Sequence, residues 1–330
     1  MAVIMSSQES QNGMYSLMLK NFAGQNGICV MDLEKDAVSF REPGMAFRDA
    51  EPPAEVKDFE AKFAEVIEKP MDMILGKINR MSKSILLKRT ELETIKKYIL
   101  LQMNRTPYSD AEAEDDKDLW KKETSAILDM EWDALMKSEL ADVLKDSAEV
   151  NNSFLLFFRT DEEFVIGDSG CVAECIPGAV NPESGEKEDD FINYNLFPLT
   201  SEIAVLLISL PWKMRFSSPE SVRGLPLTSP ILEKYRSTPN TKYINERRIR
   251  SEEDVSKFKH PMDRFTYMIH DVSADDLHYL NTLTINESER FVGFRTPAKA
   301  MPTLESYDSM KDKAELSHDL SAIIGKVGGL

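Results

Sequence analysis

The sequence predicts an α+β protein in which a helical N-terminal half packs on a mixed or antiparallel β-sheet region. Two observations favour this class. Apolar residues recur at helical spacing through residues 54–149, and short runs rich in Val, Ile and Phe follow one another through residues 153–210. The 330 residues are 42% hydrophobic and 29% charged, a globular balance that excludes a mostly disordered chain.

Residues 1–53 are expected to form a small α/β segment. Two short apolar runs, at 28–33 and 37–40, are separated by the charged residues 34–36. This pattern predicts a β-hairpin with the charged residues at its tip. The residues at 42–53 contain several prolines and charges, so we expect a loop there.

Residues 54–150 are expected to be helical. A helix break is expected at Arg105, because Thr106 precedes Pro107 and is driven out of the helical backbone conformation. A further helical stretch is expected at 119–144. The buried faces of the first helices are predicted from two apolar stripes: Val56, Phe59, Phe63 and Ile67, then Leu92, Ile95, Ile99 and Met103.

Residues 151–300 are expected to be β-rich. Ser273 precedes a helical pattern at 274–287 and is predicted to cap it, with acidic residues in the first turn. The predicted strands lie at 154–158, 163–166, 172–176, 191–196, 203–209, 265–272 and 290–294.

Two further segments complete the predicted organisation. Residues 210–260 contain many prolines and basic residues and are expected to form an irregular basic loop. Residues 301–330 are expected to be a polar C-terminal tail with at most one weak helix. An alternative that the sequence leaves open is that all these segments form one integrated domain.

The ends of the chain and the cysteines limit its location. The first residues, MAVIMSSQES, contain neither a basic region nor a long apolar stretch, so no signal peptide is expected. The longest apolar runs are far shorter than the ~20 residues that span a bilayer. Cys29, Cys171 and Cys175 are too few for a disulfide framework and are expected to be structural. We therefore expect a cytoplasmic protein with no membrane partner.

Charge is unevenly distributed along the chain. The formal net charge is −17, yet residues 210–250 contain nine basic and three acidic residues. Aromatic residues are interleaved there, which suggests a groove for nucleic acid with Arg215, Arg247 and Arg248 as anion-binding residues. The alternative is that this segment is a solvated face that pairs with the acidic stretch at 108–150, or that it docks an acidic protein partner.

One short motif attracts attention as a catalytic candidate. Gly167-Asp168-Ser169-Gly170 is similar to the box around a serine-protease nucleophile, but it lacks the further glycine and proline, and no histidine precedes it. We interpret it as a turn that closes a strand. Asp168 then lies at a strand end, a position from which carboxylates often bind a metal or a substrate hydroxyl.

Several segments in order resemble a domain-of-unknown-function family of roughly 300-residue bacterial and fungal proteins. The resemblance covers about residues 12–295. Within it, the family pattern singles out Gln102, Arg105, Asp168, Ser169, Pro198 and Asn281. The chain departs from the family at residues 11–14, where Gln-Asn-Gly-Met replaces a histidine followed by proline. The segments are LKNFA at 19–23, QMNRTP at 102–107, FVIGDS at 164–169, FPLTS at 197–201, LN at 280–281 and ERFV at 289–292.

The first functional hypothesis is a hydrolase or nuclease-like effector in bacterial defence. Asp168 would act as a metal ligand or general base, Arg105 would stabilise developing negative charge, and Asn281 would complete the catalytic set. Gln102 and Ser169 would bind the ligand. A divalent metal is the candidate cofactor, with Glu163 and Glu174 as the nearest additional acids.

The second hypothesis is a non-catalytic binding or regulatory module that docks a protein partner. The singled-out polar residues would then be structural: Arg105 would meet the negative end of a helix dipole, and Asn281 would bond a neighbouring loop. The sequence leaves both hypotheses open.

Overall fold

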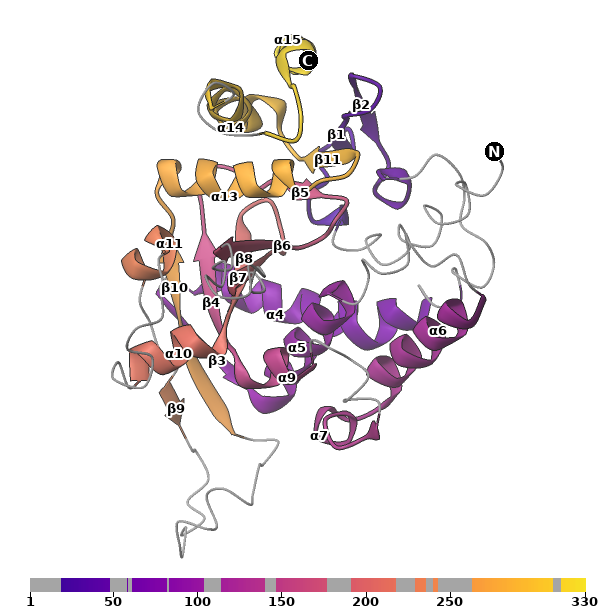
Figure 1. Ribbon diagram of the computed structural model, residues 1–330, viewed down its shortest axis with the longest axis vertical. Helices are drawn as coiled ribbons and strands as arrows, with labels where there is room; N and C mark the ends of the chain where they lie inside the picture. The colour runs from indigo at the N-terminus through magenta and orange to yellow at the C-terminus, as the bar shows by residue number, and fades with distance from the viewer. Residues whose placement is uncertain are drawn as a thin grey trace, which may run out of the picture.

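The computed structural model confirms the α+β class, with two β-sheets and helices packed against both (Figure 1). The described residues are 19–47, 58, 61–81, 83–103, 114–139, 147–176, 191–217, 229–235, 240–242, 263–310 and 316–330.

The larger sheet has seven strands and forms the centre of the molecule. Its strand order is β3-β10-β4-β8-β7-β6, with β9 paired to β10. The β4–β10 pair is parallel and the other pairs are antiparallel, so the sheet is mixed. Its strands are β3 (Ser84–Lys88), β4 (Phe154–Arg159), β6 (Val172–Ile176), β7 (Phe191–Pro198), β8 (Ile203–Ile208), β9 (Asn240–Lys242) and β10 (Arg264–Asp271).

The central strands β4 and β8 are buried on both faces. Their sequences, FLLFFR and IAVLLI, lack polar alternation, as expected for strands covered on both sides. Alternate residues serve two different cores: Leu155 and Phe157 face the first, whereas Leu156 and Phe158 face the second.

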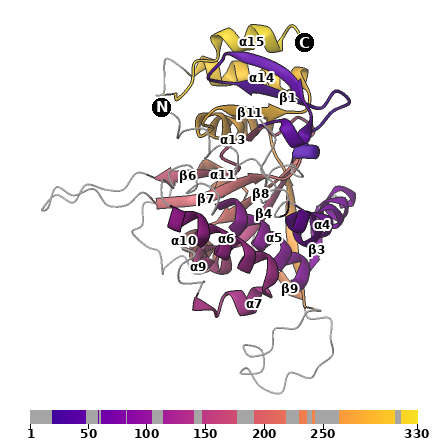
Figure 2. The same ribbon diagram turned by 90° about the vertical axis from the view of Figure 1, so that its right-hand side faces the viewer.

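Helices cover the two faces of this sheet, which gives three layers (Figure 2). The first core packs the sheet against the π-helix η3 (Ala64–Glu68) and the helices α4 (Lys69–Arg80), α5 (Arg89–Met103), α6 (Glu114–Asp129), α7 (Trp132–Leu135) and α9 (Ser147–Asn152). The second core packs it against α10 (Leu210–Ser217), α11 (Pro230–Lys234) and α13 (Ala274–Asn286).

The smaller sheet joins the two ends of the chain and lies beside the C-terminal helices (Figure 1). All its described strand pairs are antiparallel, in the order β2-β1-β11-β5. α13 links both sheets, because its Leu280 packs in the second core and its Ile285 in the core under this sheet. The elements here are β1 (Ile28–Asp32), β2 (Ala37–Arg41), the short η2 (Pro43–Met45), β5 (Ile166–Gly167), β11 (Phe291–Phe294), α14 (Pro297–Ser309) and α15 (Ser321–Val327).

Several expectations about local structure are confirmed. β1 and β2 form the predicted hairpin, and the side chain of Ser273 caps α13 by accepting a hydrogen bond from the amide of Asp276. The helices of residues 54–150 also pack directly on the β-rich region, since both contribute to the first core.

Other segments differ from the expectation. β3 lies inside the stretch expected to be entirely helical, because residues 84–88 pair with β10. Residues 301–330, expected as a polar tail, contain most of α14 and all of α15, whose Leu304, Tyr307 and Ile323 are buried. Residues 210–260, expected to be irregular, include α10, α11 and β9. Among the residues that the structure describes, none of the helices combines the length and the apolar character needed to cross a bilayer.

Candidate functional site

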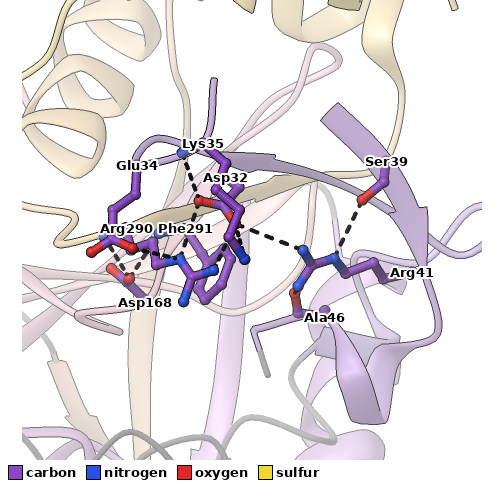
Figure 3. Close-up of polar contacts among 9 residues, drawn as sticks. All are labelled: Asp32, Glu34, Lys35, Ser39, Arg41, Ala46, Asp168, Arg290 and Phe291. Carbon is purple, nitrogen blue, oxygen red and sulfur yellow. Dashed lines mark hydrogen bonds and ion pairs between the residues drawn. The ribbon is translucent and has the colours of Figure 1, made fainter. Parts of the chain in front are cut away.

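Asp168, the leading catalytic candidate, lies directly after β5 and binds backbone amides. Its carboxylate accepts hydrogen bonds from the amides of Glu289 (2.9 Å), Arg290 (2.8 Å) and Phe291 (2.8 Å). Its own amide donates to the carbonyl oxygen of Phe291 at 3.0 Å. Successive amides that converge on one anion form a concave anion-binding arrangement. Asp168 therefore fastens the turn after β5 to the start of β11 (Figure 3).

A buried ion pair lies beside this turn. The guanidinium of Arg290 donates to the carboxylate of Asp32 through Nε at 3.1 Å and Nη2 at 2.8 Å, and it lies over the Phe291 ring at 4.3 Å (Figure 3). Burial raises the pKa of Asp32, but the hydrogen bonds and charge of Arg290, with Lys35, outweigh it and leave that pKa below its ordinary value. The pair is thus ionised and ties β1 to the residue before β11.

Asn281 lies in the middle of α13 and is completely buried. Its Oδ1 accepts a hydrogen bond from the amide of Val165 (3.1 Å), and its Nδ2 donates to the carbonyl oxygen of Glu163 (2.8 Å) and to Oγ1 of Thr303 (3.1 Å). Asparagine is unfavourable inside a helix, so these tertiary bonds explain its position. The amide joins α13 to α14 and to the loop before β5.

The remaining predicted site residues are dispersed. Arg105, Arg247 and Arg248 lie outside the described residues. Gln102 is fully buried at the end of α5, and neither polar atom of its side chain has a hydrogen-bond partner among the residues that the structure describes. Ser169 follows Asp168 in the turn.

Arg215 belongs to a different layer. Its Nη2 forms an ion pair with Oε1 of Glu233 at 2.9 Å, and its guanidinium lies 4.8 Å from the centre of the Trp212 ring. Trp212 and Tyr235, two of the aromatic residues interleaved in the basic segment at 210–250, are buried in the second core. α5 packs in the first core and α10 in the second, so Gln102 and Arg215 lie on opposite faces of the large sheet.

The structure reveals a denser polar group around Glu174, on β6. Glu174 is 7% exposed, and its carboxylate accepts hydrogen bonds from Nδ2 of Asn193 and from the hydroxyl of Tyr279, both at 2.9 Å. Trp212 Nε1 in turn donates to Oδ1 of Asn193 at 2.8 Å. Tyr279 is 38% exposed, so the buried carboxylate is hydrogen-bonded directly to a residue that reaches the surface. Burial, and then the charge of Glu174, raise the pKa of Tyr279 well above its ordinary value, which keeps the phenol protonated.

A second carboxylate, that of Asp276, belongs to the same group. It accepts hydrogen bonds from Lys234 Nζ, the Tyr235 hydroxyl and the Ser273 hydroxyl. Burial alone raises the pKa of Asp276, but Lys234 and the two hydroxyls outweigh it, so that pKa is lowered.

The buried phenol of Tyr194 lies within electrostatic reach of both carboxylates, although its hydroxyl makes no hydrogen bond among the described residues. Burial, followed by the charges of Glu174, Tyr279 and Asp276, raises the pKa of Tyr194 well above its ordinary value. All three groups therefore act electrostatically on this phenol. We call the set the Glu174 network: Glu174, Asn193, Tyr194, Lys234, Tyr235, Asp276 and Tyr279.

Sequence reasoning named Glu174 only as a neighbour of Asp168. The helical spacing of Asp276 and Tyr279 is a local signal. The pairing of Glu174 with Tyr194 and the contact of Tyr279 with Glu174 arise only from the pairing of β6 with β7 and the packing of α13 on β6. As for metals, the described part of the chain contains no group of three or more His, Cys, Asp or Glu side chains that could hold an ion.

These features define an α+β protein with two sheets joined by one helix and with a carboxylate–phenol network on that helix. The chain belongs to the family described as Protein of unknown function (DUF4238), whose model matches residues 16–298. The family resemblance predicted from the motifs is thereby confirmed. No curated protein and no solved structure matches the chain significantly.

Proposed function

We propose that the protein is a hydrolase whose reacting groups belong to the Glu174 network. One observation carries the proposal: the buried carboxylate of Glu174 is hydrogen-bonded by Tyr279, a residue that is 38% exposed. A general base needs a fixed orientation and access to the proton that it removes. Asn193 and Tyr279 provide the orientation, and the position of Tyr279 at the surface provides the access.

In this proposal Glu174 accepts a proton from the attacking water, with the Tyr279 hydroxyl between them as a relay. Glu174 then returns the proton to the leaving group, so that one water molecule is consumed for each bond cleaved. Lys234 is half-exposed and bonded to Asp276, and Asp276 raises the pKa of this lysine. The ammonium therefore stays charged and stabilises negative charge that develops on the substrate.

Nucleic acid is a less favoured substrate than a small molecule. Among the described basic residues of the segment 210–250, Arg215 pairs with Glu233 and Lys213 donates to the carbonyl oxygen of Asn152 at 2.7 Å. Arg215 and Lys213 already have partners within the chain, so they are less available to bind the phosphates of a nucleic acid. A nuclease-like effector of bacterial defence remains one outcome of the test below.

The alternative proposal is the binding module that docks a protein partner. It is favoured by the internal bonds of Asp168 and Asn281, which explain both residues without any reaction. In that case the Glu174 network fixes α13 to the sheet, and its carboxylates have no chemical role. Measured turnover of a substrate would distinguish the hydrolase from the binding module.

The experiment measures hydrolysis by the full chain against ester, phosphomonoester, glycoside and single-stranded nucleic-acid substrates. We expect turnover on one of these classes. Glu174→Gln should lower kcat/KM by about 10² or more, because general bases contribute typically 10²–10⁴. Tyr279→Phe should lower it less, since water can replace the relay.

The matched control is Glu202→Gln, a change at an exposed residue outside the network. It should retain wild-type activity, and all variants should show wild-type circular dichroism. Full activity in Glu174→Gln would refute the assignment of the base. The binding module would replace the hydrolase if no substrate class is turned over and a stoichiometric protein partner is recovered with both wild type and Glu174→Gln.

A further inference from the structure

A row of basic residues crosses three adjacent strands at one end of the large sheet. In register, Arg264 of β10 pairs with Lys88 of β3 on one side and with Lys242 of β9 on the other. Residues directly opposite each other in a sheet have Cβ atoms about 4.5–5.5 Å apart, and like charges in such positions are destabilising. The register therefore places cationic residues side by side, an arrangement that a bound anion would stabilise.

Arg264 and Lys88 lie on a face of the sheet that the second core does not cover. Side chains alternate along a strand, and Phe265 and Tyr267 of β10 pack on the first core, so Arg264 lies on the other face. Met268 shares this face and is 43% exposed, and it does not belong to the second core. β9 and the adjoining part of β10 lie at the end of the molecule opposite α14 and α15 (Figure 1). The residues of β3 and β10 on this face, all partly or fully exposed, are Ser84, Leu86, Lys88, Arg264, Thr266 and Met268.

The acidic residues next to the row are committed to other partners. Asp263 precedes Arg264, but its carboxylate accepts hydrogen bonds from Arg89 through Nε at 3.2 Å and Nη2 at 2.6 Å. Glu91 accepts hydrogen bonds from the backbone amide of Lys88 at 2.7 Å and from a lysine of α4 at 2.8 Å. The same two strand ends thus carry one complementary pair, Arg89 with Asp263, and one like-charged pair, Lys88 with Arg264.

The like-charged pair keeps donors that no described residue uses. The Nε atom of Arg264 is buried and has no hydrogen-bond partner among the residues that the structure describes. Lys88 is exposed, and within the described part of the chain its ammonium belongs to no ion pair. A guanidinium is a planar fork that matches the oxygens of a phosphate, and an ammonium adds a point charge. The two side chains are therefore suited to bind one phosphate group together.

A small phosphorylated ligand fits this face better than a nucleic acid does. Bases that bind a sheet stack on aromatic side chains, whereas Phe265 and Tyr267 of β10 lie on the first-core face. The net charge of −17 also repels a long polyanion more strongly than a single phosphate group. We propose that Lys88 and Arg264 bind the phosphate group of a small phosphorylated ligand on the open face of β3 and β10. This site is separate from the Glu174 network and does not depend on the hydrolase.

The test compares thermal unfolding of the full chain in sodium phosphate and in sodium chloride of equal ionic strength. We expect phosphate to raise the thermal midpoint of wild type in a concentration-dependent manner, because a ligand that binds only the folded state stabilises it. Lys88→Gln and Arg264→Gln should each lower the affinity for phosphate about tenfold or more, since each removes a charged hydrogen-bond donor. The matched control is Lys122→Gln, a change at an exposed lysine of α6, which should bind phosphate as wild type does.

The same variants test the repulsion between the two cations. In chloride alone, Lys88→Gln and Arg264→Gln should leave the thermal midpoint unchanged or raise it, because either change removes a like-charge contact. A clear fall of the midpoint in chloride would show that these cations stabilise the fold through partners in the chain, and it would overturn the site. The site is also overturned if phosphate does not stabilise wild type, or stabilises wild type and both variants equally.

A short single-stranded oligonucleotide distinguishes the two sources of a phosphate group. We expect it to bind no more tightly than inorganic phosphate does. Tighter binding that is steeply salt-dependent and is lost in Lys88→Gln would overturn the small-ligand assignment in favour of a nucleic acid. Glu174→Gln should retain the phosphate effect, so failure of the hydrolase proposal and failure of this site can be told apart.

Discussion

Arg290 binds the carboxylate of Asp32 through two guanidinium nitrogens, although 258 residues separate the two in the sequence. Both side chains are buried, with exposed fractions of 7% and 2%. The pair therefore connects β1, near one end of the chain, with β11, near the other. Asp168 binds the amide of the same Arg290, so one residue is fixed through its side chain and its backbone.

Loss of the Arg290 side chain should be strongly destabilising. Arg290→Met leaves Asp32 buried without its main cation, and breaking a buried pair in this way typically costs 3–5 kcal/mol. We expect the free energy of unfolding in urea to fall by about that amount. The matched control is Lys62→Met, which breaks the exposed pair of Lys62 with Asp129 and should cost about 0–1 kcal/mol.

The same variant has a pH signature. The pKa of Asp32 is lowered in the folded protein, so its ionised form contributes stability at neutral pH that is lost as the pH falls through the acid range below 3.8. This acid-side loss should be smaller in Arg290→Met than in wild type. Identical acid unfolding curves would contradict the assigned ion pair.

Asp168→Asn separates a structural role from a catalytic one. The carboxylate of Asp168 accepts hydrogen bonds from three backbone N–H groups. In the asparagine variant, the side-chain NH2 group is a donor, so at least one of these N–H groups loses its acceptor. We expect a loss of about 1–3 kcal/mol in the free energy of unfolding. Asp161→Asn, a change at an exposed residue of the preceding loop, should stay within about 0.5 kcal/mol. Wild-type stability combined with loss of a measured hydrolytic activity would instead favour the catalytic hypothesis for Asp168.

Gln102 and Asn281 offer a comparison between two fully buried amides. Gln102 has no hydrogen-bond partner among the described residues, so Gln102→Leu should leave the thermal midpoint unchanged or raise it. Asn281→Leu removes three hydrogen bonds and strands buried polar groups, which should cost about 2–4 kcal/mol. A large loss of stability in Gln102→Leu would show that this amide has a partner after all.

Alanine substitutions at two glycines should change the free energy of unfolding in opposite directions. Gly27 has φ +96°, and an added Cβ would lie 2.4 Å from the carbonyl oxygen of Arg41, so Gly27→Ala should cost about 1–3 kcal/mol. Gly76 lies within α4 with nothing within 4 Å of its Cβ position, and Gly76→Ala should stabilise by about 0.5–1 kcal/mol. Urea unfolding measures the free energy of unfolding of both variants. It tests whether the chain before β1 needs the positive φ of Gly27 and whether Gly76 lies on an open helix surface.

Local patterns predicted much of the secondary structure. The β1–β2 hairpin, the Ser273 cap and the buried strands β4 and β8 depend on residues adjacent in sequence, so their signals could be read directly. β3 was missed because its pairing partner, β10, lies far along the chain. α14 was obscured by Pro297 and Pro302, although its Leu304 and Tyr307 are buried.

The candidate site was less predictable. The position of Asp168 at a strand end was foreseen, whereas its partners, the amides of residues 289–291, are 121–123 positions away. Glu174 and Tyr279 are 105 residues apart and meet only because α13 packs across the large sheet. The chemistry of these carboxylates depends on burial and on distant donors, which composition and spacing do not contain.

By itself, the sequence determined the α+β class, the family and the apolar stripe of α5, because periodicity and short motifs are local properties of the chain. Val56 and Phe59 of the other predicted stripe lie outside the described residues. The tertiary structure decided which polar side chains are committed to backbone amides, as in Asp168 and Asn281, and which carboxylates gather with phenols around Glu174. The physical reason is that hydrogen bonding and desolvation act over a few ångströms in space, whatever the separation along the chain.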